Sequence, residues 1–295
     1  KGTMGFYCLI ADDTVTNYTS TSEWQPMLYD YQLNGTNVVW LTFINPITMQ
    51  VPPGMANLAK CKGQSGCPPS TTKVIFSVGG EAYSEKKWAW LQTKELALAV
   101  AQNVSKWDTL YGADGIDLDI EGTAGNDPNA AENLVYFAQQ LRSLNPNLLI
   151  TQPVYGYPQI AAENAMVNNG YKQDTNGDWV STDLIDSIGL MVYSNEKSLS
   201  YVNDYEVSKQ NQGWPIQVDV PYQYIQVGLQ GGASSSSIMD MANSVISEKL
   251  NGIMVWYSSV YDATRKQAAL QYDKKSNAYP TNSPAWAAAL QKMME

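Results

Sequence analysis

Three acidic residues alternate with large apolar residues in one short stretch of this sequence, and they are its strongest candidates for chemistry. Asp117, Asp119 and Glu121 are separated by Leu118 and Ile120, and a period of two is typical of a strand with one polar and one apolar face. The three carboxyl groups therefore share one face within about 14 Å of strand. Their mutual repulsion predicts that at least one holds a proton near neutral pH, which is what an acid catalyst requires.

A calcium-binding loop and an edge strand with a solvated acidic face are the structural alternatives for this stretch. Calcium loops favour turns that contain Gly, Asn and backbone ligands. Alternation with the β-branched residues Ile116 and Ile120 does not fit such a turn. The pattern therefore favours a catalytic function over a structural one.

The residue types that are absent or rare exclude several kinds of catalysis. The chain has no histidine, which removes Ser-His-Asp and Cys-His catalysis and the commonest zinc ligands. Its three cysteines are too few for a metal site. We expect chemistry that depends on carboxylates, tyrosines and backbone groups, with no metal and no cofactor.

The charge and the hydropathy restrict the partners of the protein. The balance of 18 basic and 28 acidic residues gives a net charge of −10, which argues against nucleic acid and anionic membranes as partners. A neutral or a cationic polymer is compatible with this charge. No apolar run approaches the roughly 20 residues of a membrane span. The first predicted strand begins almost at residue 1, so we expect any signal peptide to have been removed.

The cysteine spacing allows one small disulfide. Cys61 and Cys67 flank a short loop that contains glycine and lysine, and six residues of separation permit a bond between them. Cys8 lies in the first predicted strand, where we expect a buried thiol.

The elements that must position the acidic residues can be read from the alternation of strand-like and helix-like segments. Eight apolar runs are rich in strand-forming residues: Met4–Ala11, Val38–Asn45, Lys73–Gly79, Gly115–Glu121, Leu148–Val154, Ser187–Tyr193, Tyr224–Leu229 and Gly252–Tyr257. The clearest amphipathic helices between them are Ser84–Tyr111, Asn129–Leu144, Ser234–Leu250 and Ser283–Met294. This alternation predicts a parallel sheet.

Eight such units predict a closed barrel of the α/β class rather than an open sheet. An open doubly wound sheet is the alternative, but it usually has fewer strands and a Gly-rich turn after the first one, which is absent here. No linker or low-complexity tract divides the chain. We therefore expect residues 1–295 to form one domain, with functional residues at the carboxyl ends of the barrel strands.

The residues at these strand ends resemble those of glycoside hydrolase family 18, the family of the chitinases. The stretch from Asp114 to Glu121 fills every position of the family's DxxDxDxE signature. Ser77-Val78-Gly79-Gly80 is similar to the family's SxGG, and Met191-Val192-Tyr193 is similar to its MxY. Trp256 stands in the eighth strand, where the family has a tryptophan. The resemblance covers nearly the whole chain and implies a (β/α)8 TIM barrel.

The resemblance also implies a role for each of these residues. Glu121 would be the general acid and then the base, while the substrate's own 2-acetamido carbonyl attacks the anomeric carbon. Asp119 would bond the acetamide N–H, and Asp117 would share a proton with Asp119. Tyr193 would donate its hydroxyl to the attacking carbonyl, and Trp256 would form an apolar floor under the sugar. The remaining residues expected to contact sugar are Tyr7, Gly80, Asn45, Tyr155 and Met191.

Three details of the sequence refine the expectation. Ser194 follows Tyr193 where many family members have Asp or Asn, and Asn195 comes one residue later. Only about two dozen residues separate the seventh and eighth predicted strands, which is too few for the α+β insertion that deepens the groove of some chitinases. We expect Asp114 to cap or turn the chain at the start of its strand, without a catalytic role.

We expect a secreted, monomeric, endo-acting chitinase whose partners are chitin or chito-oligosaccharides. An endo-β-N-acetylglucosaminidase that acts on the chitobiose core of N-glycans is the enzymatic alternative. An inactive chitin-binding lectin, inhibitor or storage protein is the alternative from another class, although such relatives often lack the acid and Glu121 is intact. A glycan-holding loop would have to come from Asn164–Asp186, where we expect instead a small excursion on the rim.

Overall fold

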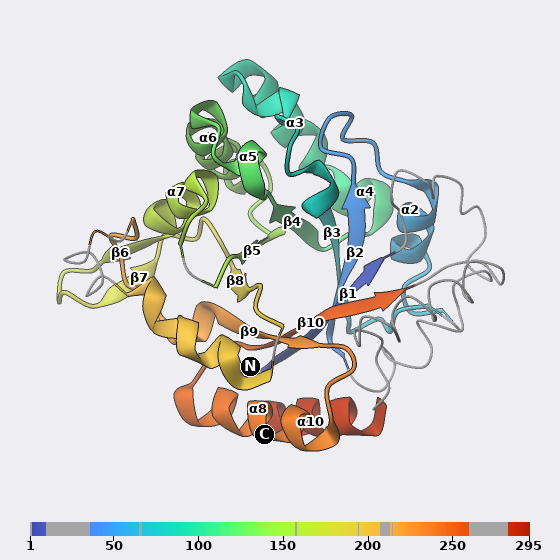
Figure 1. Cartoon of the computed structure of the whole chain (residues 1–295). Coiled ribbons are helices and arrows are strands. Elements are labelled where there is room, and N and C mark those ends of the chain that lie inside the picture. The colour runs from blue at the N-terminus through green and yellow to red at the C-terminus, as the bar shows by residue number, and fades with distance from the viewer. Residues whose placement is uncertain are drawn as a thin grey trace.

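The computed structural model describes residues 2–9, 36–64, 67–156, 158–193, 195–206, 213, 215–259 and 283–295. Eight parallel strands close a barrel in the order β1-β10-β9-β8-β5-β4-β3-β2 (Figure 1). These strands are β1 (Thr3–Leu9), β2 (Val38–Ile44), β3 (Lys73–Gly79), β4 (Gly115–Asp119), β5 (Leu149–Val154), β8 (Ser187–Leu190), β9 (Ile225–Gln230) and β10 (Gly252–Ser259). The predicted TIM barrel is confirmed. The last two residues of the first predicted strand lie outside the described residues.

The helices surround this barrel (Figure 1). They are α2 (Pro53–Lys60), α3 (Lys94–Val104), α4 (Trp107–Tyr111), α5 (Gly122–Gly125), α6 (Pro128–Leu144), α7 (Ala161–Gly170), α8 (Ser235–Glu248) and α10 (Ser283–Met294). Short 3-10 helices are η2 (Glu81–Tyr83), η3 (Ala89–Leu91), η4 (Asn195–Tyr205) and η6 (Tyr222–Tyr224). Within the described ranges, every helix is too short or too polar to span a lipid bilayer.

The single long helix predicted over Ser84–Tyr111 is wrong, because this segment is divided into η3, α3 and α4. Trp88 and Trp90 are both buried, and side chains two residues apart do not share one face of a helix. The helix α3 begins only after Thr93, whose hydroxyl accepts the backbone N–H of Leu96 at 3.2 Å. Apolar content alone did not reveal this interruption.

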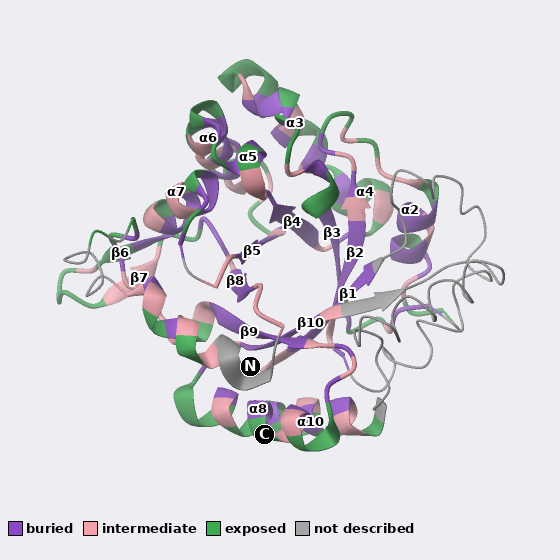
Figure 2. Cartoon of the chain, viewed as in Figure 1, coloured by how far each residue is buried: buried purple, intermediate pink, exposed green. Residues whose placement is uncertain are grey.

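The core lies mainly between the strands and the surrounding helices. Figure 2 shows buried residues along the strands and on the inward faces of the helices, with exposed residues on the outward faces. A smaller cluster of Tyr7, Trp40, Ile75 and Met254 is separate from this core, and Met191, Tyr193 and Trp256 pack against it. This second cluster therefore brings several candidate site residues into contact.

Two strands that lead into the site end two or three residues earlier than the apolar runs predict. β4 ends at Asp119 and β8 ends at Leu190, so Glu121 and Tyr193 each lie just beyond a strand. Glu121 keeps an extended backbone, with φ −122° and ψ 167°, before α5 begins. The side-chain alternation of β4 therefore continues to Glu121, although its backbone has left the sheet.

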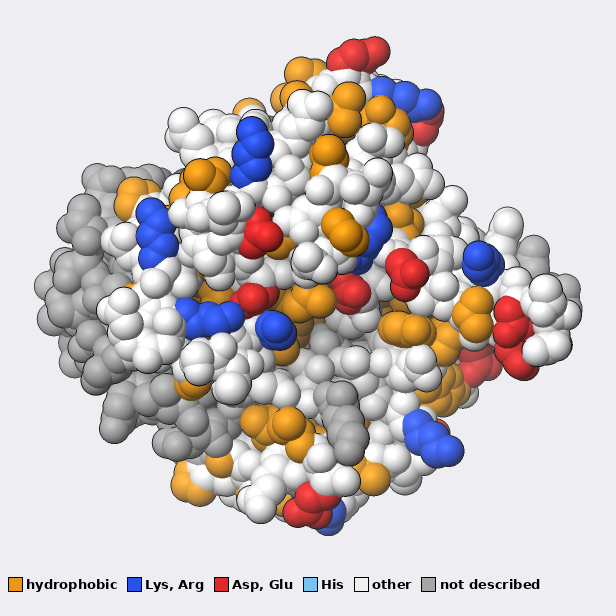
Figure 3. Space-filling view, turned by 180° about the vertical axis from the view of Figure 1, so that it is seen from behind, with side chains coloured by type: hydrophobic (Ala, Val, Ile, Leu, Met, Phe, Trp, Pro, Cys, Tyr) orange, Lys and Arg blue, Asp and Glu red, His pale blue; other side chains and the backbone are white. Residues whose placement is uncertain are grey.

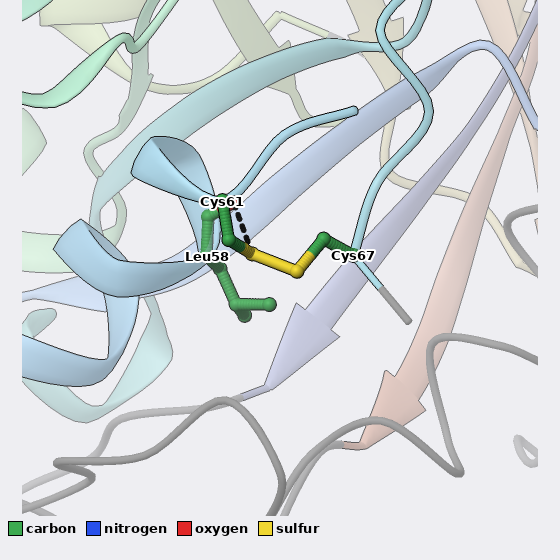
Figure 4. The surroundings of a disulfide bond; sticks show 3 residues. All are labelled: Leu58, Cys61 and Cys67. Carbon is green, nitrogen blue, oxygen red and sulfur yellow. Dashed lines mark hydrogen bonds between the residues drawn. A yellow bond between two sulfur atoms is a disulfide. The ribbon is translucent and has the colours of Figure 1, made fainter. Parts of the chain in front are cut away.

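The predicted disulfide between Cys61 and Cys67 is present, with 5.8 Å between the two Cα atoms. It closes the loop that follows α2, and the Cys61 Sγ also contacts the carbonyl oxygen of Leu58 at 3.5 Å (Figure 4). Cys8 is buried, as predicted, and takes no part in this bond.

The excursion predicted on the rim is a helix and a hairpin, and its position corrects the expectation. α7 is followed by the antiparallel pair β6 (Tyr171–Gln173) and β7 (Trp179–Ser181), which projects from the body of the protein (Figure 1). A helix of a βα unit runs back toward the start of the strands, so a hairpin after α7 lies at the amino-terminal end of the barrel. The ring of Tyr171 accordingly packs 5.6 Å from that of Tyr224, which directly precedes β9.

The connection between β9 and β10 contains the single helix α8. The compact barrel without an α+β insertion at this point is therefore confirmed.

Candidate active site

The alternation along β4 separates two kinds of side chain, as the sequence predicts. Asp117 and Asp119 are buried, with 0% and 6% of their surface exposed, and Glu121 is half-buried at the carboxyl end. Ile116 and Leu118 belong to the core on the other side of the strand. The carboxyl groups therefore form a row that begins deep in the barrel and ends at its carboxyl mouth.

Asp117 is surrounded by hydroxyl groups from three other strands of the barrel: the neighbours β3 and β5, and the more distant β1. Ser77 Oγ and Thr151 Oγ1 each donate to its carboxylate at 2.7 Å, and the Tyr7 hydroxyl lies 3.1 and 3.2 Å from the two oxygens. The barrel register explains this arrangement, because Asp117 pairs with Ser77 on β3 and with Thr151 on β5. Burial raises the pKa of Asp117 to about 7, and these hydrogen bonds oppose the increase. Asp117 can therefore change its charge near neutral pH.

Asp119 and Glu121 form a carboxyl pair. Burial raises the pKa of Asp119 well above its ordinary value, and the charges of Glu121, Asp117 and Glu163 raise it further. Burial also raises the pKa of Glu121 to about 7, with a contribution from the charge of Glu81. The hydrogen bond between the two carboxyl groups raises the pKa of Asp119 and lowers that of Glu121. The two carboxyl groups are therefore hydrogen-bonded to each other, and both hold a proton more tightly than exposed carboxyl groups do.

This pairing differs in its partner from the sequence expectation, in which Asp119 shares its proton with Asp117. The Oδ1 atom of Asp119 is buried and has no hydrogen-bond partner among the described residues. An unpartnered buried oxygen is costly, and a ligand N–H would satisfy it. The geometry therefore offers the buried Oδ1 atom of Asp119 as an acceptor for a ligand N–H.

Aromatic side chains form a wall at the same mouth of the barrel. The ring of Trp256 lies 5.9 Å from that of Tyr7, 6.0 Å from that of Phe43 and 6.5 Å from that of Tyr193. Burial, followed by the charges of Asp119, Glu121 and Asp117, raises the pKa of Tyr193 well above its ordinary value. Its hydroxyl therefore stays protonated and can donate a hydrogen bond. Met191 packs in the same cluster.

Gly79 and Gly80 bring the end of β3 into close contact with its neighbours. Both have positive φ, +103° and +91°, a conformation that favours glycine. A Cβ on Gly79 would lie 2.2 Å from the carbonyl oxygen of Asp119, and one on Gly80 would lie 2.8 Å from the Phe43 ring. The backbone N–H of Gly80 donates to the same Asp119 carbonyl at 2.9 Å. The two glycines thus fix the main chain beside the acidic row.

Tyr155 and Asn45, the other two strand-end residues predicted to contact sugar, have different surroundings. The Tyr155 hydroxyl accepts the backbone N–H of Gly122, the residue after Glu121, and its pKa is raised to about 12 by burial and then by the charge of Glu121. Asn45 Oδ1 instead accepts the backbone N–H of Ile47 at 2.8 Å and stabilises a turn. The structure therefore brings Tyr155, and not the oxygen of Asn45, to the acidic row.

Asp114 has a structural position, as expected. Its Oδ2 atom pairs with Lys62 Nζ at 2.6 Å and accepts the backbone N–H of Val74 at 2.8 Å. It fixes the start of β4 against β3 from outside the acidic row.

The sequence predicted no role for two residues that belong to this site, Thr151 and Glu163. Thr151 donates to Asp117 and also accepts the indole N–H of Trp40 at 3.0 Å. Glu163, on α7, is 1% exposed, and a negative charge at this position would raise the pKa of Asp119. Thr151 lies opposite Asp117 through the register of β4 and β5, which no local sequence pattern reveals. No local pattern distinguishes Glu163 from a surface glutamate.

The distribution of the charged side chains in the described part of the chain bears on the binding of metals and polyanions. Among the described residues, no group of His, Cys, Asp or Glu is arranged to hold a metal ion. Figure 3 shows Lys and Arg side chains interspersed with acidic and uncharged ones on the face opposite to that of Figure 1, without a basic patch there.

The comparison with known proteins identifies the family of this chain and agrees with its fold. The sequence profile of "Glycosyl hydrolases family 18" matches residues 14–196, and the chain belongs to this family. No curated protein is significantly similar in sequence.

Solved structures of family 18 chitinases have the same fold at low sequence identity. One from the chitin utilization locus of Flavobacterium johnsoniae has a TM-score of 0.60 and 15% identity, and the match covers 87% of this chain and 88% of that one. A chitinase from Rhizomucor miehei has a TM-score of 0.59 and 15% identity over 98% and 99% of the two chains. One from Cycas revoluta, in complex with allosamidin, has a TM-score of 0.60 and 12% identity over 98% and 99%.

Proposed function

We propose that this protein is an endo-acting chitinase that hydrolyses β-1,4 bonds between N-acetylglucosamine units with retention of configuration. The observation that carries the proposal is the row of Asp117, Asp119 and Glu121, which begins deep in the barrel and ends at its carboxyl mouth. The aromatic wall of Tyr193 and Trp256 stands beside it. We propose that residues 1–295 act as a single catalytic domain.

Glu121 is the proposed general acid. A glycosidic oxygen is a poor leaving group unless it is protonated, and an acid whose pKa is near the working pH serves best. The pKa of Glu121 is raised to about 7. In neutral solution its carboxyl group is therefore protonated in a large fraction of the molecules. Its half-buried position at the mouth of the barrel lets it reach a bound chain.

The substrate supplies the nucleophile in this mechanism. The 2-acetamido carbonyl oxygen attacks the anomeric carbon, the bond to the leaving sugar breaks, and the proton of Glu121 passes to the leaving oxygen. The ionised Glu121 then takes a proton from water, and the resulting hydroxide opens the oxazolinium ion. Two inversions at the anomeric carbon give net retention.

Asp119, Asp117 and Tyr193 would support the acetamido group. Its N–H would donate to the buried Oδ1 atom of Asp119, which has no hydrogen-bond partner among the described residues. Asp117, whose pKa is also near 7, can then share a proton with Asp119 and adjust its charge, which stabilises the positive intermediate. The Tyr193 hydroxyl would donate to the attacking carbonyl. Trp256 would pack under the sugar, whose C–H groups contact its indole.

Two structural features favour chitin or chito-oligosaccharides over N-glycans as substrates. The β9 to β10 connection is short, and the hairpin of β6 and β7 lies at the end of the barrel opposite the acidic row. Neither therefore forms a wall that could hold branched mannose. The Cycas revoluta neighbour has also been solved with (GlcNAc)3.

The Cys61–Cys67 disulfide supports secretion, because such bonds persist in oxidising compartments. We propose a monomer.

The substrate proposal is tested by incubating the protein with glycol-chitin and, separately, with a high-mannose glycoprotein. A rapid fall in glycol-chitin viscosity without glycan release is the expected result, since internal cuts shorten a polymer quickly. Glycan release without a fall in viscosity would instead identify an endo-β-N-acetylglucosaminidase. Chitin binding without either activity would identify a lectin.

A further inference from the structure

A fourth buried carboxyl group lies behind the acidic row and belongs to none of the family's motifs. Glu163, in the first turn of α7, is 1% exposed. Its Oε2 atom accepts the backbone N–H of Tyr155 at 3.3 Å, and its Oε1 atom is buried without a hydrogen-bond partner among the described residues. No cation within the described chain forms a salt bridge with it. An ionised carboxylate in such a place would be costly.

The surroundings of Glu163 favour its protonated, neutral form. Burial raises its pKa well above the ordinary value, the N–H of Tyr155 opposes this, and the charge of Glu121 raises it further. In this form its contribution is an oxygen that accepts a hydrogen bond, rather than a charge.

The residue that Glu163 holds, Tyr155, is fixed at three points. Its backbone N–H donates to Glu163, its carbonyl oxygen accepts the hydroxyl of Tyr205 at 2.6 Å, and its own hydroxyl accepts the N–H of Gly122. The third contact reaches the residue that follows Glu121. The segment after β5 therefore links α7 and η4 to the start of α5, directly beside the proposed acid.

We propose that Glu163 is a positioning residue: its neutral carboxyl group fixes Tyr155 so that the Tyr155 hydroxyl holds Gly122, and with it Glu121, in place for proton transfer. The inference rests on the proposed function of Glu121. The expected effect is on the chemical step, because a misplacement of about 1 Å can cost about 100-fold in rate.

The test compares two variants at this position with a matched control. Glu163→Gln keeps an oxygen that can accept the Tyr155 N–H, so its kcat on a chito-oligosaccharide should stay within about 3-fold of the parent. Glu163→Met keeps the length but removes the acceptor, so its kcat should fall about 10-fold or more while KM changes little. Glu132→Gln, at an exposed glutamate of α6, controls for the loss of a carboxyl group elsewhere. A Glu163→Met enzyme with the parent's kcat, or a Glu163→Gln enzyme as slow as Glu163→Met, overturns the proposal.

A second variant covers the possibility that Glu163→Met does not fold. Tyr155→Phe keeps the main-chain contacts but removes the hydroxyl that holds Gly122, and it should lose kcat to a similar extent. If both variants fold, the double variant should be no slower than the slower single one, because the two residues act on the same contact. Additive losses would contradict the proposal.

The structural part of the proposal can be tested without activity. A crystal structure of Glu163→Met should show the Tyr155 hydroxyl displaced from Gly122, whereas that of Glu163→Gln should show it in place. An unchanged Tyr155 in the Met variant overturns the inference. A parent protein that is inactive on every chito-oligosaccharide refutes the proposed function instead, and the crystal structures still decide the role of Glu163.

Discussion

Thr151 offers a sensitive probe of the acidic row, because Thr151→Val removes one hydroxyl and changes the shape of the side chain little. The lost group donates to Asp117 at 2.7 Å and accepts the indole N–H of Trp40 at 3.0 Å. A hydrogen bond to a charged group contributes about 1.5–3 kcal/mol, against about 0.5–1.5 kcal/mol for a neutral pair. The variant should therefore destabilise ionised Asp117 more than protonated Asp117, by about 1–2 kcal/mol.

This difference makes the effect of the variant depend on pH. The pKa of Asp117 is raised from 3.8 to about 7 in the folded protein, so the folded state binds its proton more tightly than the unfolded state. The free energy of unfolding consequently falls as the pH rises between these two values, by about 4 kcal/mol. In Thr151→Val the folded-state pKa should rise by about one further unit. The loss of stability caused by the substitution should therefore be larger at high pH than at low pH.

The assay is urea unfolding of the parent, Thr151→Val and Thr151→Ser at about pH 5 and about pH 9. The Val variant should lose about 1–2 kcal/mol more at the higher pH, while the Ser variant, which keeps a hydroxyl, should show a much smaller difference. Carbon NMR of the Asp carboxyl groups should show the increased pKa directly. An equal loss of stability at the two pH values, together with an unchanged titration, would refute the reasoning about Asp117.

Three further predictions concern the mouth of the barrel. Glu121→Gln should bind chito-oligosaccharides, as measured by calorimetry, but lose about 10²–10⁴-fold in kcat; activity within tenfold of the parent contradicts its role as the acid. Glu81→Gln removes a charge that raises the pKa of Glu121. Activity needs protonated Glu121, so the loss of activity with rising pH should begin at a lower pH than in the parent. An unchanged pH profile counts against this coupling. Gly80→Ala should lower the melting temperature by the equivalent of about 1–3 kcal/mol, because its φ of +91° and the Phe43 ring leave no room for a Cβ; a parent-like melting curve speaks against that strain.

The parts of the site that follow from local geometry could be predicted from the sequence. Side chains on a strand alternate, so the spacing of Asp117, Asp119 and Glu121 was enough to place them on one face. The alternation of strands and helices was likewise enough to predict the barrel, because parallel strands need such crossovers. In the same way, the spacing of Cys61 and Cys67 indicated their disulfide.

The parts that depend on distant contacts could not be predicted. The contact between Thr151 and Asp117 follows from the register of β4 and β5, which no local pattern reveals. Glu163 is buried only because α7 packs behind Tyr155, and in the sequence it resembles an ordinary helix-surface glutamate. The segment Ser84–Tyr111 was predicted as one continuous helix, whereas it is interrupted where Trp88 and Trp90 are both buried.

The most direct test of the proposed mechanism is the configuration of the first product, which proton NMR can follow during hydrolysis of a chito-oligosaccharide. Attack by the substrate's own acetamido group, with Glu121 as acid and then base, inverts the anomeric carbon twice. The newly formed reducing end should therefore appear first as the β-anomer and change to the equilibrium mixture only later. Initial appearance of the α-anomer, or the absence of any hydrolysis, would contradict the substrate-assisted mechanism proposed for this site.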